Sequence, residues 1–139
     1  MKNPSIEELN AMNKGTLGES LGMEFVSMEN GLVIGKMPVD QRTCQPYGRL
    51  HGGATAALAE TLGSVGSHFI VAEKEKAAVG VEINTNHLRG VKSGFVFGKA
   101  KLIHEGGKIH VWSIDVEDEQ ERLVAVARLT VMIIPRANG

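Results

Sequence analysis

The longest helical pattern in the chain runs from Leu50 to Ala72, and its apolar residues recur with the spacing of one helix face. At about 100° per residue, one stripe contains Ala54, Ala57, Leu58, Thr61, Leu62, Val65 and Phe69. The other positions are small or weakly polar, and Glu60 is the only charged residue of the stretch. A solvent-exposed helix face normally carries several charges. The pattern therefore predicts a helix that other structure wraps on most sides.

Extended segments flank this helix on both sides. Alternating or continuous apolar residues predict strands over 23–28, 32–39, 77–88, 95–104, 108–117 and 123–134. Asn30-Gly31 between the first two is a strong hairpin signal. The last segment is apolar on both phases, which favours an interior position in the sheet. A capping box at Ser5 and Glu8 predicts a short helix ending near Gly15, and 16–22 is expected to add another helical turn. The order predicts an α+β fold with one helix packed on a curved antiparallel sheet.

Composition limits the possible classes of protein without choosing one. A length of 139 residues fits one domain spanning 1–139. The formal net charge of −1 gives no sign of a nucleic-acid partner. The sole cysteine, Cys44, excludes an internal disulfide and suits a reducing compartment. We find neither a signal-peptide pattern nor a membrane-length apolar run, so a cytoplasmic protein without membrane association is expected.

Glu60 is the first candidate for chemistry, because a lone carboxylate on a wrapped helix is expensive to bury. Ser64 lies one turn further along the same flank, and the helix opens with Gly52-Gly53, whose N–H groups a ligand oxygen can approach closely. A carboxylate, a hydroxyl and a bare helix N-terminus form a plausible place to attack a carbonyl. The alternative for Glu60 is an interfacial ion pair.

Other site classes find little support. The five histidines show no metal-ligand spacing, and the single cysteine has no partner, so no metal is predicted. The sequence has no serine nucleophile elbow, and its Gly-rich turns lack phosphate-loop spacing. His68 and His110 are expected to be structural or solvent-facing. His87 lies on the odd-numbered positions of the 77–88 strand, which carry the apolar residues, so whether it faces a ligand stays open.

Several short motifs carry a family resemblance. They are Gln45-Pro46, His51-Gly52-Gly53-Ala54, Leu58-Ala59-Glu60, Glu82-Ile83-Asn84 and Asn86-His87. With their spacing and the strand order, the chain resembles the hotdog-fold thioesterases over nearly its whole length. It is most similar to the aryl-CoA branch with phenylacetyl-CoA and 4-hydroxybenzoyl-CoA thioesterases, and within it to 1,4-dihydroxy-2-naphthoyl-CoA thioesterases and the enterobactin-pathway proofreading thioesterase.

The resemblance implies roles for individual residues. It assigns the catalytic carboxylate to Glu60, the positioning side chains to Gln45 and His51, the carbonyl-polarising N–H to Gly52 and an accompanying hydroxyl to Ser64. Loop hydrogen bonding is the alternative for Gln45, capping of the loop for His51, and helix packing for Ser64. The implied coenzyme A contacts are Gly80, Val81, His87, Leu88, Arg89, Gly90, His104, Gly106, Gly107 and Lys108. Lys108 stands where many relatives have Arg, which removes a bidentate phosphate contact.

The resemblance also implies a reaction and an assembly. We expect hydrolysis of aromatic or bulky acyl-CoA thioesters by a homodimer or a dimer-of-dimers tetramer, with active sites at the dimer interface. No cofactor is expected beyond the coenzyme A of the substrate. Ordinary solvated charges are the alternative reading of Arg89 and Lys108. The alternative functions are a proofreading thioesterase acting on acyl-carrier protein, a hotdog 3-hydroxyacyl dehydratase and a non-catalytic acyl-CoA binding module.

Overall fold

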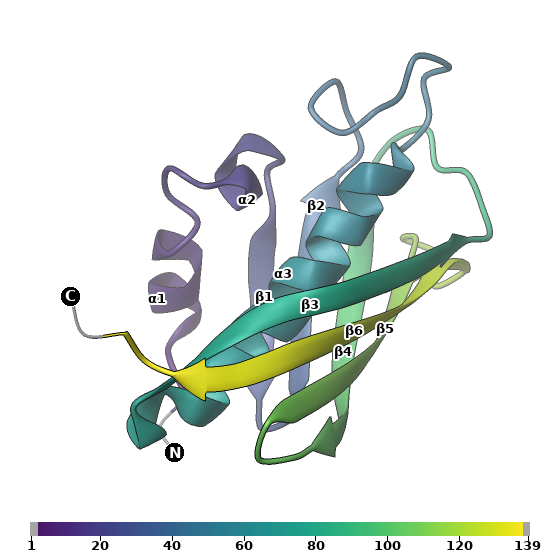
Figure 1. The fold of residues 1–139 in the computed structure, drawn as a ribbon. Helices are drawn as coiled ribbons and strands as arrows, with labels where there is room; N and C mark the ends of the chain where they lie inside the picture. Colours follow the sequence, from purple (N-terminus) through teal and green to yellow (C-terminus); the bar gives the residue numbers. More distant parts are fainter. Residues whose placement is uncertain (1–2, 138–139) are drawn as a thin grey trace.

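The computed structural model describes residues 3–137 and contains one long helix and six strands (Figure 1). The short helices are α1 (Ile6–Ala11), α2 (Leu17–Ser20) and the 3-10 turn η1 (Ala72–Lys74), and the long helix is α3 (Gly52–Val71). The strands are β1 (Glu24–Glu29), β2 (Leu32–Pro38), β3 (Lys76–His87), β4 (Phe95–Glu105), β5 (Ile109–Glu117) and β6 (Leu123–Pro135).

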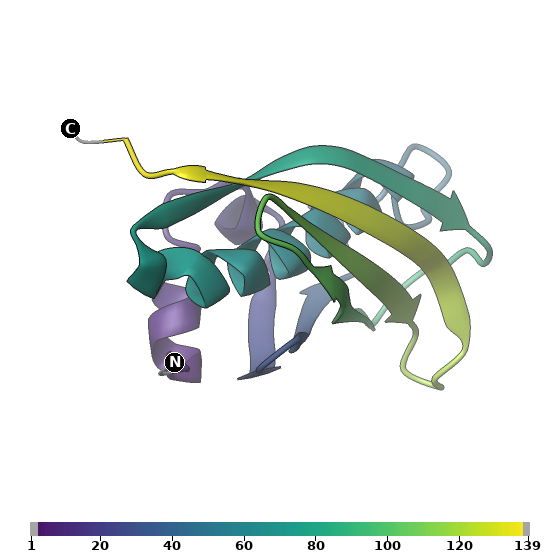
Figure 2. The same cartoon turned by 60° about the horizontal axis from the view of Figure 1, so that its bottom comes forward.

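All six strands form one antiparallel sheet in the order β1-β2-β4-β5-β6-β3. The sheet curves around α3, which lies along its concave face (Figure 2). This arrangement is the hotdog fold and confirms the predicted α+β class. As expected from its continuous apolar pattern, β6 is an interior strand, between β5 and β3.

Small residues allow the sheet to approach α3 closely. A Cβ at Gly66 would lie 2.5 Å from the Trp112 ring, and one at Gly63 would lie 2.7 Å from a methyl of Leu129. Trp112 and Leu129 are fully buried on β5 and β6. The wrapping predicted from the absence of charge is confirmed.

The predicted apolar stripe of α3 is partly wrong. Ala57, Thr61, Val65 and Phe69 are only half-buried. The fully buried positions include Thr55, Ala59, Gly63, Gly66 and Ser67, which a hydrophobicity pattern does not single out. The sheet therefore covers the small-residue side of the helix as well as the predicted leucines.

Local boundaries differ slightly from expectation at the N-terminus. Helix α1 ends at Ala11 instead of near Gly15, because hydrogen-bonded turns replace the helix from Met12 onward. A side-chain bond helps to set this boundary: the Nδ2 of Asn13 donates to the carbonyl of Met23 at 3.0 Å and ties the turn to the start of β1.

The two edge strands of the sheet are β1 and β3, and only β1 has a helix packed beside it. Helix α1 packs beside β1, whereas β3 runs along the outside of the molecule with Val79, Val81, Glu82, Asn84 and Asn86 exposed (Figure 1). Long unpaired edge strands are unusual in monomers, because their free N–H and C=O groups pair readily with other chains.

Among residues 3–137, no helix is both long and apolar enough to cross a bilayer.

Candidate active site

The carboxylate of Glu60 lies on the flank of α3 that the sheet leaves partly open. Glu60 and Ser64, one turn apart, both line a pocket of about 410 Å³. The structure therefore brings together the carboxylate and the hydroxyl that the sequence paired. Among the described residues, Glu60 forms no ion pair, so the interfacial alternative finds no partner within one chain.

Strand β3 supports this carboxylate from the side. A Cβ at Gly80 would lie 2.6 Å from the Oε2 of Glu60, so the glycine lets the carboxylate lie directly against β3. The β3–β6 register shifts between Gly80 and Glu82, which places Val81 in a bulge beside it. Gly80 and Val81, expected to contact coenzyme A, therefore lie next to the candidate catalytic group.

The N-terminus of α3 is the second candidate group. His51 caps the helix: the N–H of Gly53 donates to its Nδ1 at 2.7 Å, which leaves the ring proton on Nε2. The structure thus shows the capping role of His51. The N–H of Gly52 donates to no group among the described residues, so it is free to bind a ligand oxygen.

Further predicted residues gather beside Gly52. Gln45, His87, Leu88, Arg89 and Gly90 line one pocket of about 460 Å³ together with Gly52. A Cβ on Gly52 would lie 2.8 Å from the Nε2 of His87, so the exposed His87 faces the helix N-terminus. The side-chain oxygen of Gln45 accepts from the N–H of Tyr47, which shows the loop-bonding role.

The two candidate groups are too far apart to act on one carbonyl within one chain. Gly52 and Glu60 are eight residues apart on a continuous helix, which is about 12 Å along the axis. They also line different pockets. One chain therefore contains two candidate half-sites, one with the carboxylate and one with the helix N-terminus.

The remaining residues expected to contact coenzyme A lie far from the pocket that contains Gly52. Gly106, Gly107 and Lys108 form the turn between β4 and β5, where the N–H of Gly106 donates to the carbonyl of Ile109, and His104 lies at the end of β4 just before this turn. Strand β4 has 11 residues and separates this turn from the 88–94 loop, a distance of about 35 Å. A single chain does not bring Lys108 close to Arg89.

One wall of the Glu60 pocket is formed by residues that no sequence pattern marks. Met12, Thr16 and Leu17 from the α1–α2 segment lie across the pocket from the helix, beside Phe25 of β1. These residues are more than 30 positions from Glu60 in the sequence, and no motif links them to it.

A buried polar network lies at the other end of α3, outside both half-sites. Trp112 Nε1 donates to Ser67 Oγ at 2.8 Å, and Ser67 Oγ is 2.8 Å from His110 Nδ1. His110 is buried within this network, as expected for a structural histidine. Among the described residues, no group of three metal-type side chains is present.

Comparison with known proteins defines the class. Residues 47–125 match the model of the Thioesterase superfamily. The 1,4-dihydroxy-2-naphthoyl-CoA hydrolase of Escherichia coli is 42% identical over 130 residues, 94% of this chain and 95% of that protein. The proofreading thioesterase EntH of Cronobacter turicensis is also 42% identical over 130 residues, 94% of each chain. The crystal structure of a mutant thioesterase from Pseudomonas aeruginosa superposes with a TM-score of 0.93 at 42% identity, covering 96% of each chain.

The fold, the carboxylate half-site and these similarities together define a thioester hydrolase on the hotdog fold. The chain belongs to the Thioesterase superfamily.

Proposed function

We propose that the protein hydrolyses aromatic or bulky acyl-CoA thioesters to the free acid and CoA, with Glu60 as the catalytic carboxylate. The observation that carries the proposal is the position of Glu60. It is the one charged side chain of its pocket, held beside Gly80 and facing apolar residues large enough to contact an acyl group.

Thioester hydrolysis suits the groups present. A thiolate leaves readily, because thiols ionise near a pKa of about 8.5, so a strong general acid is unnecessary. The reaction needs a nucleophile and stabilisation of the oxyanion. Glu60 supplies the first, either by activating water or by attacking the carbonyl to form a mixed anhydride. The free N–H of Gly52 supplies the second, and one such donor contributes about 3 kcal/mol.

The shape of the Glu60 pocket favours a compact acyl group. Its volume of about 410 Å³ is in the usual range for small-molecule sites. Its apolar wall contains Met12, Leu17, Phe25 and Val65, and Phe25 and Met12 offer the ring and sulfur contacts that aromatic groups prefer.

We further propose that a dimer completes the site, with Glu60 from one chain and Gly52, Gln45 and His51 from the other. The exposed edge of β3 supports this assembly, because pairing two copies of β3 would satisfy its free backbone groups. A two-fold pairing also provides a way for Lys108 of one chain to approach Arg89 of the other. We also propose that two such dimers form a tetramer. The proposed location of the protein is the cytoplasm.

A second candidate substrate is an acyl-carrier protein thioester. The similarity to a proofreading thioesterase favours it. The near-neutral charge of the chain offers no broad basic surface for such a partner, so we place CoA thioesters first.

A thiol-release screen tests the function. We expect kcat/KM to be higher for benzoyl-type CoA thioesters than for palmitoyl-CoA and for the same aryl group on a carrier protein. A preference for palmitoyl-CoA would show that the pocket accepts a long chain instead. Formation of a 2-enoyl product without free thiol would identify a dehydratase.

A further inference from the structure

Thr55, in the first turn of α3, is a buried polar residue whose hydroxyl has no partner. Its side chain is 1% exposed. In the first half of the helix, the side-chain hydrogen bonds of the described residues are those of His51 and Thr61, and Thr55 Oγ1 takes part in neither. Burying a hydroxyl without a partner is unfavourable. Packing alone therefore does not explain a threonine at this position.

The helix itself cannot satisfy this hydroxyl. A threonine within a helix commonly donates to the carbonyl four residues earlier, as Thr61 does to Ala57 at 2.7 Å. The equivalent carbonyl for Thr55 is that of His51, which already accepts from the N–H groups of Ala54 and Thr55 at 3.1 and 3.2 Å. Because a carbonyl oxygen has two lone pairs and both are used, the Thr55 hydroxyl is left free.

The free hydroxyl faces the pocket that contains Gly52. Thr55 lines this pocket together with Gly52. Among the described residues that are not exposed, only the Thr85 hydroxyl is both unpaired and sealed off from open space, so the Thr55 hydroxyl retains access to the pocket. A ligand in this pocket can therefore reach a buried donor.

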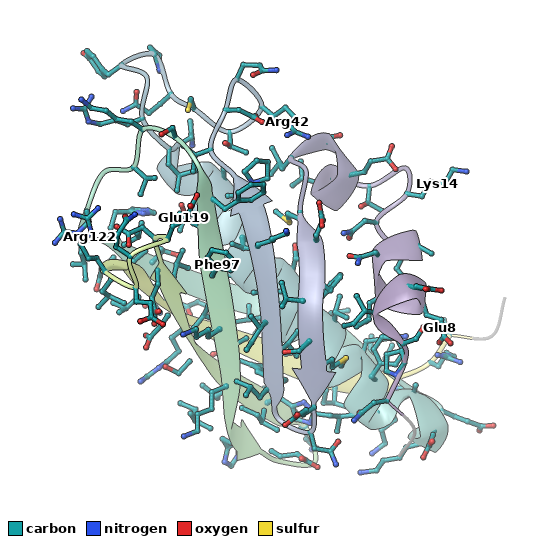
Figure 3. The ribbon with its side chains drawn as sticks, turned by 180° about the vertical axis from the view of Figure 1, so that it is seen from behind. Glu8, Lys14, Arg42, Phe97, Glu119 and Arg122 are labelled. Carbon is teal, nitrogen blue, oxygen red and sulfur yellow. The ribbon has the colours of Figure 1, made fainter. Side chains whose placement is uncertain are left out.

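Two loops partly shield this end of α3 from solvent. The 40–50 loop, with Arg42 near its start, and the 88–94 loop extend beyond the sheet where the helix begins (Figure 3). They contribute Leu50 and Leu88 to the pocket, and β6 contributes the buried Val124. A hydrogen bond is stronger in such partly apolar surroundings than in water.

The Thr55 hydroxyl and the free N–H of Gly52 are directed at the same space. The two residues are three positions apart, which on an α-helix is about 60° around the circumference and about 4.5 Å along the axis. Side chains of a helix lean towards its N-terminus, so the hydroxyl is directed back towards the first turn. Both groups line the same pocket, and neither donates to any group among the described residues.

We propose that Thr55 is a second oxyanion donor, which acts with the N–H of Gly52 on the thioester carbonyl oxygen. The proposal rests on the proposed thioesterase function and adds a catalytic group that neither motif nor similarity assigned. When the nucleophile bonds to the thioester carbon, the π electrons of the carbonyl move onto its oxygen, and both donors bind this oxyanion. When the C–S bond breaks, the carbonyl re-forms and the thiolate leaves. The Thr55 hydroxyl keeps its proton throughout.

An isosteric substitution tests the donor. Thr55→Val keeps the shape of the side chain and removes the hydroxyl. We expect kcat for a benzoyl-type CoA thioester to fall by about 10²-fold, as for other single oxyanion donors, with KM nearly unchanged, since the contact strengthens only as charge develops. Thr55→Ser, which retains the hydroxyl, should keep most of the wild-type kcat. Thr130→Val, which removes a half-buried hydroxyl from β6 outside both half-sites, should behave like wild type.

Thermal stability separates this role from a structural one. Replacing an unpaired buried hydroxyl by a methyl group should leave the melting temperature of Thr55→Val equal to that of wild type or higher. A hydroxyl needed for the fold would instead make Thr55→Val melt at a lower temperature, and this result would overturn the proposal. Wild-type kcat in Thr55→Val would overturn it too. So would an increase in KM alone, because it would identify a contact made equally in the ground state.

A bound carbonyl reports on the donor without turnover. The probe is S-phenacyl-CoA, a thioether ketone that cannot be hydrolysed, isotopically labelled at its carbonyl carbon. Loss of a hydrogen bond raises the carbonyl stretching frequency, so isotope-edited infrared spectra should show a higher frequency in Thr55→Val than in wild type and Thr55→Ser. Identical frequencies in Thr55→Val and wild type would contradict the proposal. If the wild type hydrolyses no thioester, the proposed function fails, while the infrared comparison still decides whether Thr55 binds the carbonyl.

Discussion

Glu60 lies between a glycine and an apolar pocket, and its environment gives it few roles other than chemistry. The Oε2 lies against Gly80, and the open side faces residues that offer no cation. Retaining a half-buried carboxylate without a partner is unfavourable for stability. The position is therefore better explained by a reaction than by packing.

Removing this carboxylate should abolish most activity. We expect Glu60→Gln to lower kcat by at least about 10²-fold, at the lower end of general-base effects, without reducing the melting temperature. Glu73→Gln, which neutralises an exposed carboxylate just beyond the same helix, is the matched control and should retain full activity. Near wild-type thiol release by Glu60→Gln would show that another group carries the reaction.

His110 is the residue whose protonation the fold resists. Burial lowers the pKa of its imidazole below the usual value; Glu105 opposes this decrease, and Lys74 and His104 add to it. In the folded state Nδ1 of the buried ring is hydrogen-bonded to the Ser67 hydroxyl, a neutral partner that does not stabilise a positive charge on the imidazole.

Stability should consequently fall in mild acid. The unfolded chain binds a proton near pH 6.5, whereas folded His110 takes it only at lower pH. The stabilisation is therefore complete above about pH 6.5 and is lost as the pH falls towards the lowered pKa. Denaturant unfolding between pH 5 and 7.5 should show a flatter profile for His110→Gln than for wild type, while His87→Gln should follow wild type. Parallel profiles for His110→Gln and wild type would contradict this account.

At the scale of elements, α3 and its sheet depend on close approach through glycine. Gly66→Ala would improve helix propensity by about 1 kcal/mol in isolation. The added Cβ would, however, meet the ring of Trp112 at 2.5 Å, and both groups are buried. We expect net destabilisation by about 1–3 kcal/mol, as for other overpacked cores. Ser64→Ala, on the open flank of the helix, should change the free energy of unfolding by less than about 0.5 kcal/mol. A Gly66→Ala variant as stable as wild type would show that the sheet can move away.

Most elements could be predicted from the sequence because local signals mark them. Asn30-Gly31 gives a hairpin, and its two strands lie within a residue of the expected bounds. The helix runs from Gly52 to Val71, as its lack of charge and its flanks indicate. The buried face of α3 was less predictable, since Gly63, Gly66 and Ser67 are buried for their small size and not for hydrophobicity.

The site was predictable only in part, for a related reason. Glu60 and Ser64 share a helix flank, so their proximity follows from helical periodicity. The walls contributed by Met12 and Leu17, and the pocket shared by Gly52 and His87, depend on contacts between distant segments. Such contacts leave no periodic signal in a single sequence.

At the scale of the whole molecule, the separation of the two half-sites is the central feature. The N–H of Gly52 and the carboxylate of Glu60 lie about two helical turns apart, and they open into different pockets. The exposed β3 edge is available for a second copy. The account therefore requires that one active site takes Glu60 and Gly52 from different chains, and a fully active monomer by light scattering would contradict it.

A specific substitution removes the oxyanion donor with little effect on folding. Gly52 is the first residue of α3, a position where proline is well tolerated and its missing N–H leaves no helical bond unmade. His51 has an extended backbone, φ −71° and ψ 130°, which is compatible with a following proline. Gly52→Pro should thus lose activity, whereas Gly52→Ala, which also crowds His87 but keeps the N–H, should retain much more of it.

The most direct test is complementation between two inactive chains. Glu60→Ala and Gly52→Pro are co-expressed in equal amounts, so that half of the dimers are mixed and each mixed dimer has one intact site. The account predicts recovery of roughly one quarter of wild-type thiol release per chain, the statistical expectation for a two-fold dimer. Activity no higher than that of the two variants measured separately would show that each site is formed within one chain, and would contradict the account.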